Sequence, residues 1–286
     1  MISCNSDFTI NTQKLDQTIQ NDINNNFIPF IIVGTVGSVN VGSIDSLIIL
    51  KEISLKYNCW FHIDGAFGGS LIFSNSYKYK IKGIENADSI AFDFHKWIHI
   101  NYDAGFILIR DSIKHRNSFS ARPEYLRSLD HGIAGGDFWG VDYGPELSRS
   151  FRALKVWTHF KLHGTKLIGD SIDMNIDLAQ YLYQLITKDS KYCNILESLA
   201  PVTLQINVFR YIGNNNNNFM LDKLNEKIII ECQNSGIAVP SSTNINGNVA
   251  IRVNITNHRT TREDLDLFIA TIIELGKKFE NMDFIK

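Results

Sequence analysis

Two stretches decide the fold of this chain: residues 60–70, WFHIDGAFGGS, and residues 89–97, SIAFDFHKW. Each begins with the apolar pattern of a buried strand and becomes polar where the strand would end. The first strand ends at Asp64, and Lys96 follows the second. In an open α/β sheet the ligand site lies outside the carboxyl ends of the strands. We therefore expect Asp64 and Lys96 to face one pocket, although 32 positions separate them.

The two side chains suit one kind of chemistry. A lysine amine that forms a Schiff base and an acid that keeps a pyridine nitrogen protonated are the fixed protein groups that a pyridoxal phosphate (PLP) enzyme requires. Taken singly, a strand-end aspartate is most often a cap or turn residue, and a lysine after a strand is most often solvated. Here the lysine adjoins an aromatic cluster, and the paired glycines Gly68 and Gly69 are expected to leave room for a flat ligand.

At these residues the chain resembles a known family. HIDGAF (62–67), the 32-residue interval and DFHKW (93–97) are similar to the group II PLP-dependent decarboxylases, which act on aromatic amino acids, histidine or glutamate. SGIAVPSST (235–243) and NVAIRVNITNHRT (248–260) resemble the C-terminal domain of bacterial members. The resemblance runs from about residue 30 to residue 280.

The resemblance implies an α/β fold of the PLP-dependent transferase type (fold type I). We expect a PLP-binding large domain, partial at its N-terminal side, over residues 1–163, and a smaller α+β domain over residues 164–286. The large domain should contain a mostly parallel sheet with one antiparallel member.

Local patterns predict the elements of this sheet. Strands are expected at 30–33, 60–64, 89–94 and 105–110, with a helix capped by Ser43 or Asp45 and running to about residue 57. Residues 111–143 have no clear period and are expected to form a loop. An amphipathic helix at 150–163 should stop at Gly164.

The expected smaller domain has weaker patterns. A helix is predicted within 178–186, strands near 202–211 and 250–255, and a helix at 220–233. Thr260 and Glu263 have the spacing of a capping box that opens a last helix.

The resemblance also implies roles for site residues. Lys96 would carry PLP, Asp64 would pair with its ring nitrogen, and Ala66 would pack on one ring face. His95 would lie near the phosphate or the mobile loop.

Two further roles concern loops. Either Thr35 or Ser38 would face the cofactor from the loop after the first strand. In the loop expected to be mobile, Tyr125 follows Pro123 by two positions, as the catalytic tyrosine of the family does, and would return a proton to the substrate α-carbon. In this family a tyrosine there accompanies decarboxylation to the amine, which favours decarboxylation of an L-amino acid, with an aromatic substrate preferred.

Two features depart from the family pattern. Family members are much longer, and the expected missing part holds a ring-stacking histidine, part of the phosphate cradle and a segment that wraps the dimer. We therefore expect a homodimer, or a site completed by an N-terminal segment. The second departure is Asp93, where many relatives carry an asparagine close to the phosphate; an acid there is unfavourable unless it is protonated or turned away.

Composition limits the possible partners. The chain has 286 residues, 44% hydrophobic and 20% charged, which is ordinary for a globular protein. A net charge of −2 gives no indication of a nucleic-acid or membrane-surface partner. Four scattered cysteines, with no CxxC pair and no signal-peptide pattern, argue against zinc or a disulfide framework and favour a reduced cytoplasmic setting.

Three alternatives stay open at this point. A carbon–carbon lyase of the sphingosine-phosphate type shares the His-Lys pair, whereas aminotransferases are less favoured because their lysine usually follows a serine-containing motif. The third alternative is a catalytically inactive fragment that folds poorly or serves only as an interaction partner. A nucleotide-binding function has little support, because no GK[ST] or GxGxxG follows the glycine-bearing loop at 34–42.

Overall fold

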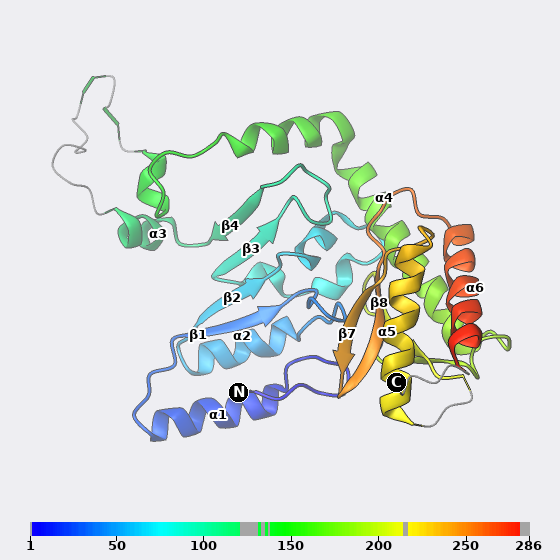
Figure 1. Ribbon diagram of the computed structural model, residues 1–286. Helices are drawn as coiled ribbons and strands as arrows, with labels where there is room; N and C mark the ends of the chain where they lie inside the picture. The colour runs from blue at the N-terminus through cyan, green and yellow to red at the C-terminus, as the bar shows by residue number, and fades with distance from the viewer. Residues whose placement is uncertain (1, 121–130, 133–134, 137, 214–216, 281–286) are drawn as a thin grey trace.

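A computed structural model describes residues 2–120, 131–132, 135–136, 138–213 and 217–280. The described chain forms two four-stranded sheets, and the long helix α4 (Arg152–Lys188) contributes buried side chains to the cores of both (Figure 1). The first sheet is α/β and the second is antiparallel with helices packed on it, as expected from the sequence.

The first sheet carries the candidate site. Its strands, in spatial order, are β1 (Ile31–Thr35), β2 (Trp60–Asp64), β3 (Ser89–Asp93) and β4 (Gly105–Ile109). β1, β2 and β3 are parallel, and β4 is antiparallel to β3, so the predicted strands and the antiparallel member are confirmed. The carboxyl ends of β1, β2 and β3 consequently meet at one edge of the sheet.

Two helices precede and follow β1. Asn11 caps α1 (Thr12–Asn24) by accepting a hydrogen bond from Lys14 N. α2 (Leu47–Lys56) begins after Ser46, so the cap expected at Ser43 or Asp45 is wrong. The Asp45 carboxylate instead accepts hydrogen bonds from Ile10 N and Thr35 N, which ties the N-terminal segment to the end of β1.

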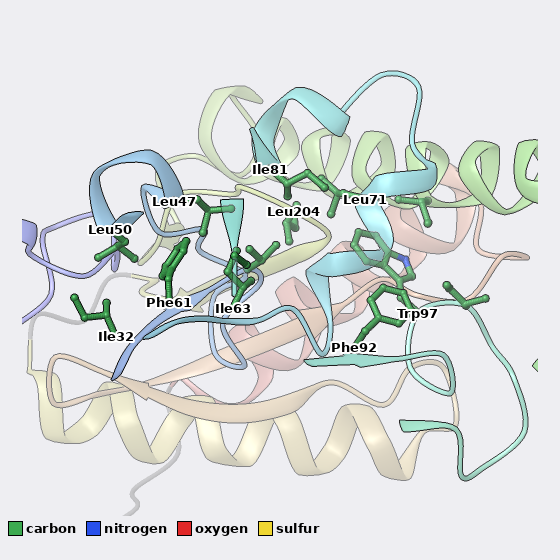
Figure 2. Close-up of a cluster of buried hydrophobic side chains, with 14 of the residues drawn as sticks. Ile32, Leu47, Leu50, Phe61, Ile63, Leu71, Ile81, Phe92, Trp97 and Leu204 are labelled. Carbon is green, nitrogen blue, oxygen red and sulfur yellow. The ribbon is translucent and has the colours of Figure 1, made fainter. Parts of the chain in front are cut away.

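One face of this sheet is closed by apolar packing. α2 lies against β1 and β2, and the side chains drawn in Figure 2 fill the space between the sheet, α2 and the short helices that follow β2. These 3-10 turns are η1 (Gly68–Phe73), η2 (Lys78–Ile81) and η3 (Ile84–Asn86). Phe61 and Ile63, the inward residues of β2, are fully buried, which explains why the alternation in this strand was readable from the sequence.

The stretch expected to be a loop contains regular structure. α3 (Ser112–Phe119) follows β4 and is capped by Asp111, whose carboxylate accepts hydrogen bonds from Ile113 N and Lys114 N. A 3-10 turn, η5 (Gly140–Tyr143), follows later. α3 escaped prediction because none of its residues is buried, so it lacks the apolar period on which such a prediction depends.

The helix expected at 150–163 continues as α4 to Lys188. Gly164 interrupts it with a positive φ of 70° and an extended ψ, which makes a kink where a helix end was expected. Ile168, Ile172 and Ile176 pack in the core of the first sheet, whereas Leu178 and later buried residues pack in the second core. The buried side chains of α4 therefore pass from the first core to the second between Ile176 and Leu178. This point lies later in the helix than the kink at Gly164, where the domain boundary was expected.

The second sheet has the order β5 (Leu196–Ser198), β6 (Ile206–Tyr211), β8 (Asn248–Asn254) and β7 (Ser241–Ile245). α5 (Asn218–Asn234) and α6 (Arg262–Phe279) pack on it. β5 and β7 were not predicted, since one has three residues and the other is mostly polar. The capping box opens α6 at Thr261 and Asp264, one position later than predicted.

The four cysteines are all free thiols, and Cys59 and Cys232 are buried. Among the helices in the described part of the chain, none combines the length and apolar character that a membrane crossing requires.

Candidate active site

Three residues form a row across the carboxyl edge of the first sheet. Thr35 on β1 is the register partner of Asp64 on β2, and Asp64 is the register partner of Ala91 on β3. Register partners on parallel strands place their side chains on the same face. The row therefore lies on the face opposite the buried side chains of Phe61 and Ile63, where the Asp64 side chain is exposed.

The Asp64 carboxylate is held at the start of the turn after β2. Its Oδ1 accepts a hydrogen bond of 3.1 Å from Ala66 N, an Asx-type contact that directs the carboxylate over the strand end. Among the described residues, the carboxylate makes no other hydrogen bond and no ion pair. One oxygen of Asp64 is thus available to a ligand.

The glycines of this turn serve packing. A Cβ at Gly68 would lie 2.6 Å from Val36 O, and a Cβ at Gly69 would lie 2.6 Å from a ring carbon of Phe92. Both glycines are buried. The expectation that they leave room for a flat ligand is therefore wrong; they let the turn approach β1 and β3 closely.

Lys96 lies in the turn that follows β3. Its Nζ is 2.7 Å from Asp93 Oδ2, and its side chain is 39% exposed. Asp93 is the last residue of β3, and the short distance shows that its carboxylate is turned toward Lys96. The sequence analysis expected Asp93 to lie unfavourably close to the cofactor phosphate. In the structure its carboxylate is paired with Lys96.

His95 is fixed beneath the same turn. Its Nδ1 accepts a hydrogen bond from Ala104 N at 2.9 Å, which in the neutral ring assigns the hydrogen to Nε2. Nε2 lies 3.9 Å from Asp93 Oδ2, and the ring packs against Tyr102 with centroids 4.0 Å apart. The imidazole side chain is only 8% exposed, so His95 packs between the lysine turn and Tyr102 and not on the surface.

Trp97 anchors the lysine turn to the rest of the molecule (Figure 2). Its ring stacks on Phe67 at a centroid distance of 4.9 Å, and its Nε1 donates a hydrogen bond of 3.0 Å to Asn175 Oδ1 on α4. Trp97 and Asn175 are both buried. The sequence analysis did not identify Asn175, because it lies 78 positions from the tryptophan and no local pattern marks it.

Of the two hydroxyl residues considered for the cofactor, the structure brings only Thr35 into the row with Asp64. Ser38 Oγ lies 2.7 Å from Ser43 Oγ and also accepts a hydrogen bond from Ser43 N. Ser38 therefore closes its own loop. Tyr125 lies outside the described residues.

A groove of about 500 Å³ lies behind the lysine turn, and its lining includes Trp97 and His99, His159 on α4, and His258 in the turn after β8. Burial lowers the pKa of His159, and the neighbouring His163 and His99 act in the same direction. Within the described ranges, no group of three or more His, Cys, Asp or Glu side chains is arranged to hold a metal ion.

The chain is similar to proteins of one family. The model of the pyridoxal-dependent decarboxylase conserved domain matches residues 1–212. The chain is 34% identical over 257 residues to an aromatic-L-amino-acid decarboxylase of Bacillus atrophaeus, covering 90% of this chain and 52% of that protein. It is 32% identical over 265 residues to a histidine decarboxylase of Drosophila melanogaster, covering 92% of this chain and 30% of that protein.

Solved structures have the same fold. The glutamate decarboxylase domain of a Vibrio parahaemolyticus protein superposes with a TM-score of 0.81 at 29% identity, covering 97% of this chain and 53% of that chain. Oryza sativa TDC with PLP and tryptamine superposes with a TM-score of 0.87 at 21% identity, covering 96% of this chain and 56% of that one. The chain thus spans about half the length of these solved structures and of the Bacillus relative. Because the family model matches well over half of its residues, the chain belongs to the pyridoxal-dependent decarboxylase family.

Proposed function

We propose that this chain supplies the lysine and the acid of a PLP-dependent decarboxylase that converts an L-amino acid, with an aromatic side chain preferred, to the amine and carbon dioxide. The observation that carries the proposal is that Asp64 ends β2 and Lys96 lies in the turn after β3, so that both residues are at the edge where these neighbouring parallel strands end. An exposed acid and an amine in this arrangement are the two groups that hold a pyridine ring and an aldehyde.

The residues present fit this cofactor. Asp64 keeps one oxygen without a protein partner among the described residues, as an acid that receives a pyridinium N–H must. Beside it, the Thr35 hydroxyl makes no hydrogen bond with a described residue and Ala91 presents a small side chain, so a flat ring could lie along the row. The Lys96 side chain is partly exposed and can be reached from this edge.

Each residue then has a chemical task. When bound, PLP supplies an electron sink for the electrons released with carbon dioxide. Lys96 provides the amine that holds the aldehyde carbon, and Asp64 keeps the ring nitrogen protonated by charge and hydrogen bonding. Ala66 packs at the ring, and Thr35, rather than Ser38, offers a hydroxyl donor. His95 directs Nε2–H toward Asp93 and so positions the acid that faces the lysine.

The proposed reaction type depends on Tyr125, which would return the proton to the α-carbon and favour the amine over an aldehyde. The proposed preference for aromatic substrates is supported by the similarity to the Bacillus atrophaeus aromatic-L-amino-acid decarboxylase at 34% identity.

The proposed assembly is a homodimer, or this chain together with a complementing segment, in the cytoplasm. Support for the setting comes from the four free thiols, which reducing conditions preserve. A second candidate function is a partner subunit or inactive fragment of such a decarboxylase.

The test separates these candidates. The purified chain is assayed for PLP retention, particle size and release of carbon dioxide from a panel of amino acids, alone and with a polypeptide that supplies the unmatched half of the Bacillus relative. We expect weak retention, a particle larger than a monomer and no turnover for the chain alone, and amine production after complementation. A cleaved carbon–carbon product would identify a lyase, and no turnover in any complemented form would support the inactive subunit.

A further inference from the structure

We infer that the turn of α4 before its kink is a binding site for a divalent transition-metal ion, with His159 and His163 as the two protein ligands. The two residues are four positions apart, so their side chains lie on the same face of the helix. Their ring centroids are 4.7 Å apart. Both side chains line the groove of about 500 Å³ behind the lysine turn, where His159 is half-buried and His163 is exposed.

The separation of the two rings suits ligands of one ion. A metal–nitrogen bond to imidazole is about 2.0–2.1 Å long. Two imidazoles bound to one ion at an angle of about 90–110°, as in square-planar or tetrahedral coordination, therefore have ring centroids roughly 4.5–5.2 Å apart. The observed 4.7 Å lies within this range, and the angle of 59° between the ring planes means that the rings are not stacked face to face.

The nitrogens of these two rings are not engaged by the protein. Within the described ranges, neither His159 nor His163 makes a hydrogen bond or an ion pair through its side chain. His62, His95 and His115 differ, because a ring nitrogen of each is hydrogen-bonded to another residue. A neutral imidazole always has one nitrogen with a free lone pair. At His159 and His163 that lone pair is available to an ion.

The kink in α4 makes this turn favourable for a cation (Figure 1). Gly164, directly after His163, has a φ of 70° and a ψ of 164°, so the regular helix that begins at Arg152 ends there. Carbonyl groups in the last turn of a helix carry partial negative charge and attract cations. An ion bound between His159 and His163 would lie in this last turn.

The charged side chains nearby do not oppose a cation. Lys155, one turn before His159, donates from Nζ to Asn101 O at 2.8 Å. Lys166 Nζ is 2.6 Å from Asp170 Oδ2. The two lysines are thus engaged elsewhere, and Asp170 contributes a negative charge to the lining of the groove.

The ligand set selects a class of ion. Imidazole nitrogen is a ligand for Cu²⁺, Ni²⁺ and Zn²⁺, whereas Mg²⁺ and Ca²⁺ prefer oxygen. In the part of the chain that the structure describes, no third His, Cys, Asp or Glu completes a metal-binding group. The other coordination positions therefore belong to water or to an atom of a bound molecule. Affinities should follow the usual order, in which Cu²⁺ binds more tightly than Ni²⁺ or Zn²⁺.

A second pair of histidines in the groove fits an ion less well. The rings of His99 and His258 have centroids 5.7 Å apart, which is wider than the range for a shared ion. They lie in turns after β3 and after β8, not on one helix. His258 therefore provides a matched control in the same groove.

The test uses the untagged chain, stripped of metal with a chelator and kept without PLP. Cu²⁺, Ni²⁺, Zn²⁺ and Mg²⁺ are added in separate calorimetric titrations, and the Cu²⁺ form is examined by electron paramagnetic resonance for nitrogen ligands. His159→Gln and His163→Gln each remove one imidazole and keep a side chain that favours a helix. His258→Gln is the control, and circular dichroism shows whether each variant is folded.

We expect one ion per chain, tightest binding of Cu²⁺, two nitrogen ligands in its spectrum and no binding of Mg²⁺. Each variant on α4 should weaken Ni²⁺ binding at least tenfold, and His258→Gln no more than about threefold. If a variant does not fold, the parent supplies a second measurement, because Ni²⁺ should protect His159 and His163 from acylation by diethyl pyrocarbonate, mapped by mass spectrometry.

Four results would each overturn the inference: no binding of any transition-metal ion, equal binding by the parent and both variants on α4, a loss in His258→Gln as large as in those variants, or unchanged acylation of His159 and His163 with Ni²⁺. None of these measurements uses PLP or turnover, so failure here is distinct from failure of the proposed decarboxylase function.

Discussion

Lys96 Nζ lies 2.7 Å from Asp93 Oδ2, so the amine proposed to hold PLP is paired with an acid three residues earlier in the chain. An amine that adds to an aldehyde has to approach the aldehyde carbon, whereas an amine at this distance from a carboxylate is held by it through a charge-assisted hydrogen bond. The pair therefore has to separate before the lysine can react. Asp93 thus becomes the residue whose removal should change the reactivity of Lys96 most directly.

Asp93→Asn should increase the rate at which Lys96 reacts with PLP by several-fold, because an amide holds the amine less strongly than a carboxylate does. The rate is measured by absorbance and by reduction with borohydride. Asp16→Asn is the matched control, since Asp16 pairs with Lys56 at the same 2.7 Å on the surface. An unchanged rate in Asp93→Asn would mean that the ion pair does not restrain the lysine.

Lys96 should be the lysine that carries the adduct after incubation with PLP and reduction. Mapping by mass spectrometry is expected to find most of the label on Lys96 and a large decrease in total label in Lys96→Ala. Lys56→Ala provides the comparison with a surface lysine that also has an acidic partner. Label spread over surface lysines and undiminished in Lys96→Ala would remove the support for this site.

Asp64→Asn should fold like the parent, because the side chains are nearly isosteric and the carboxylate makes only one hydrogen bond among the described residues. In a complemented, active form it should lose most of its turnover, since the ring nitrogen would no longer be held protonated. Activity within about threefold of the parent, a change in barrier of roughly 0.65 kcal/mol, would show that the acid is structural.

Asn175→Ala should lower the free energy of unfolding by about 1–3 kcal/mol, because the buried Trp97 indole N–H loses its acceptor. Urea unfolding measures the effect. A double-mutant cycle with Trp97→Phe isolates the pair, since phenylalanine keeps most of the ring packing and has no N–H. Additive effects of the two substitutions would show that this hydrogen bond does not stabilise the lysine turn.

Acidification should destabilise the protein through the imidazoles behind the lysine turn. Burial lowers the pKa of His159, with His163 and His99 adding to the effect, and burial and His258 lower the pKa of His99. A lowered folded-state pKa means that the unfolded chain binds the proton more readily. The contribution is present above the unfolded value of about 6.5 and is lost as the pH falls through the folded values.

The free energy of unfolding should therefore fall less steeply between pH 7 and pH 5 in the variant His159→Leu than in the parent. Denaturant unfolding at a series of pH values measures both. The same slope in His159→Leu and the parent would exclude a contribution from this cluster.

Local information was sufficient for the strands that carry the site. Phe61 and Ile63 alternate with more exposed neighbours, so β2 and its end at Asp64 could be read from a period of two. The rule that ligands gather at the carboxyl ends of parallel strands then brought Asp64 and Lys96 to one edge, and the observed register of β2 and β3 agrees with it. The family resemblance was likewise a property of contiguous motifs, and the family match confirmed it.

The remaining features depended on contacts between distant segments. Asp45 was a reasonable helix cap by sequence, but folding brings Ile10 N and Thr35 N to its carboxylate, and these two bonds outweigh one local cap. The capping box forms at Thr261, whose backbone N–H donates to Asp264 Oδ2 and whose hydroxyl accepts from Asp264 N.

The sequence by itself determined the order of the strands along the chain, the points where the strands that carry the candidate site end, and the family. Each of these depends on residues that are close together in the chain. Only the tertiary structure decided that Asp93 pairs with Lys96, that Thr35 rather than Ser38 lies beside Asp64, and that Asn175 anchors Trp97. A side-chain partner is chosen by packing and register across the fold, where several polar groups compete for the same neighbour, and that competition has no signature in a local stretch of sequence.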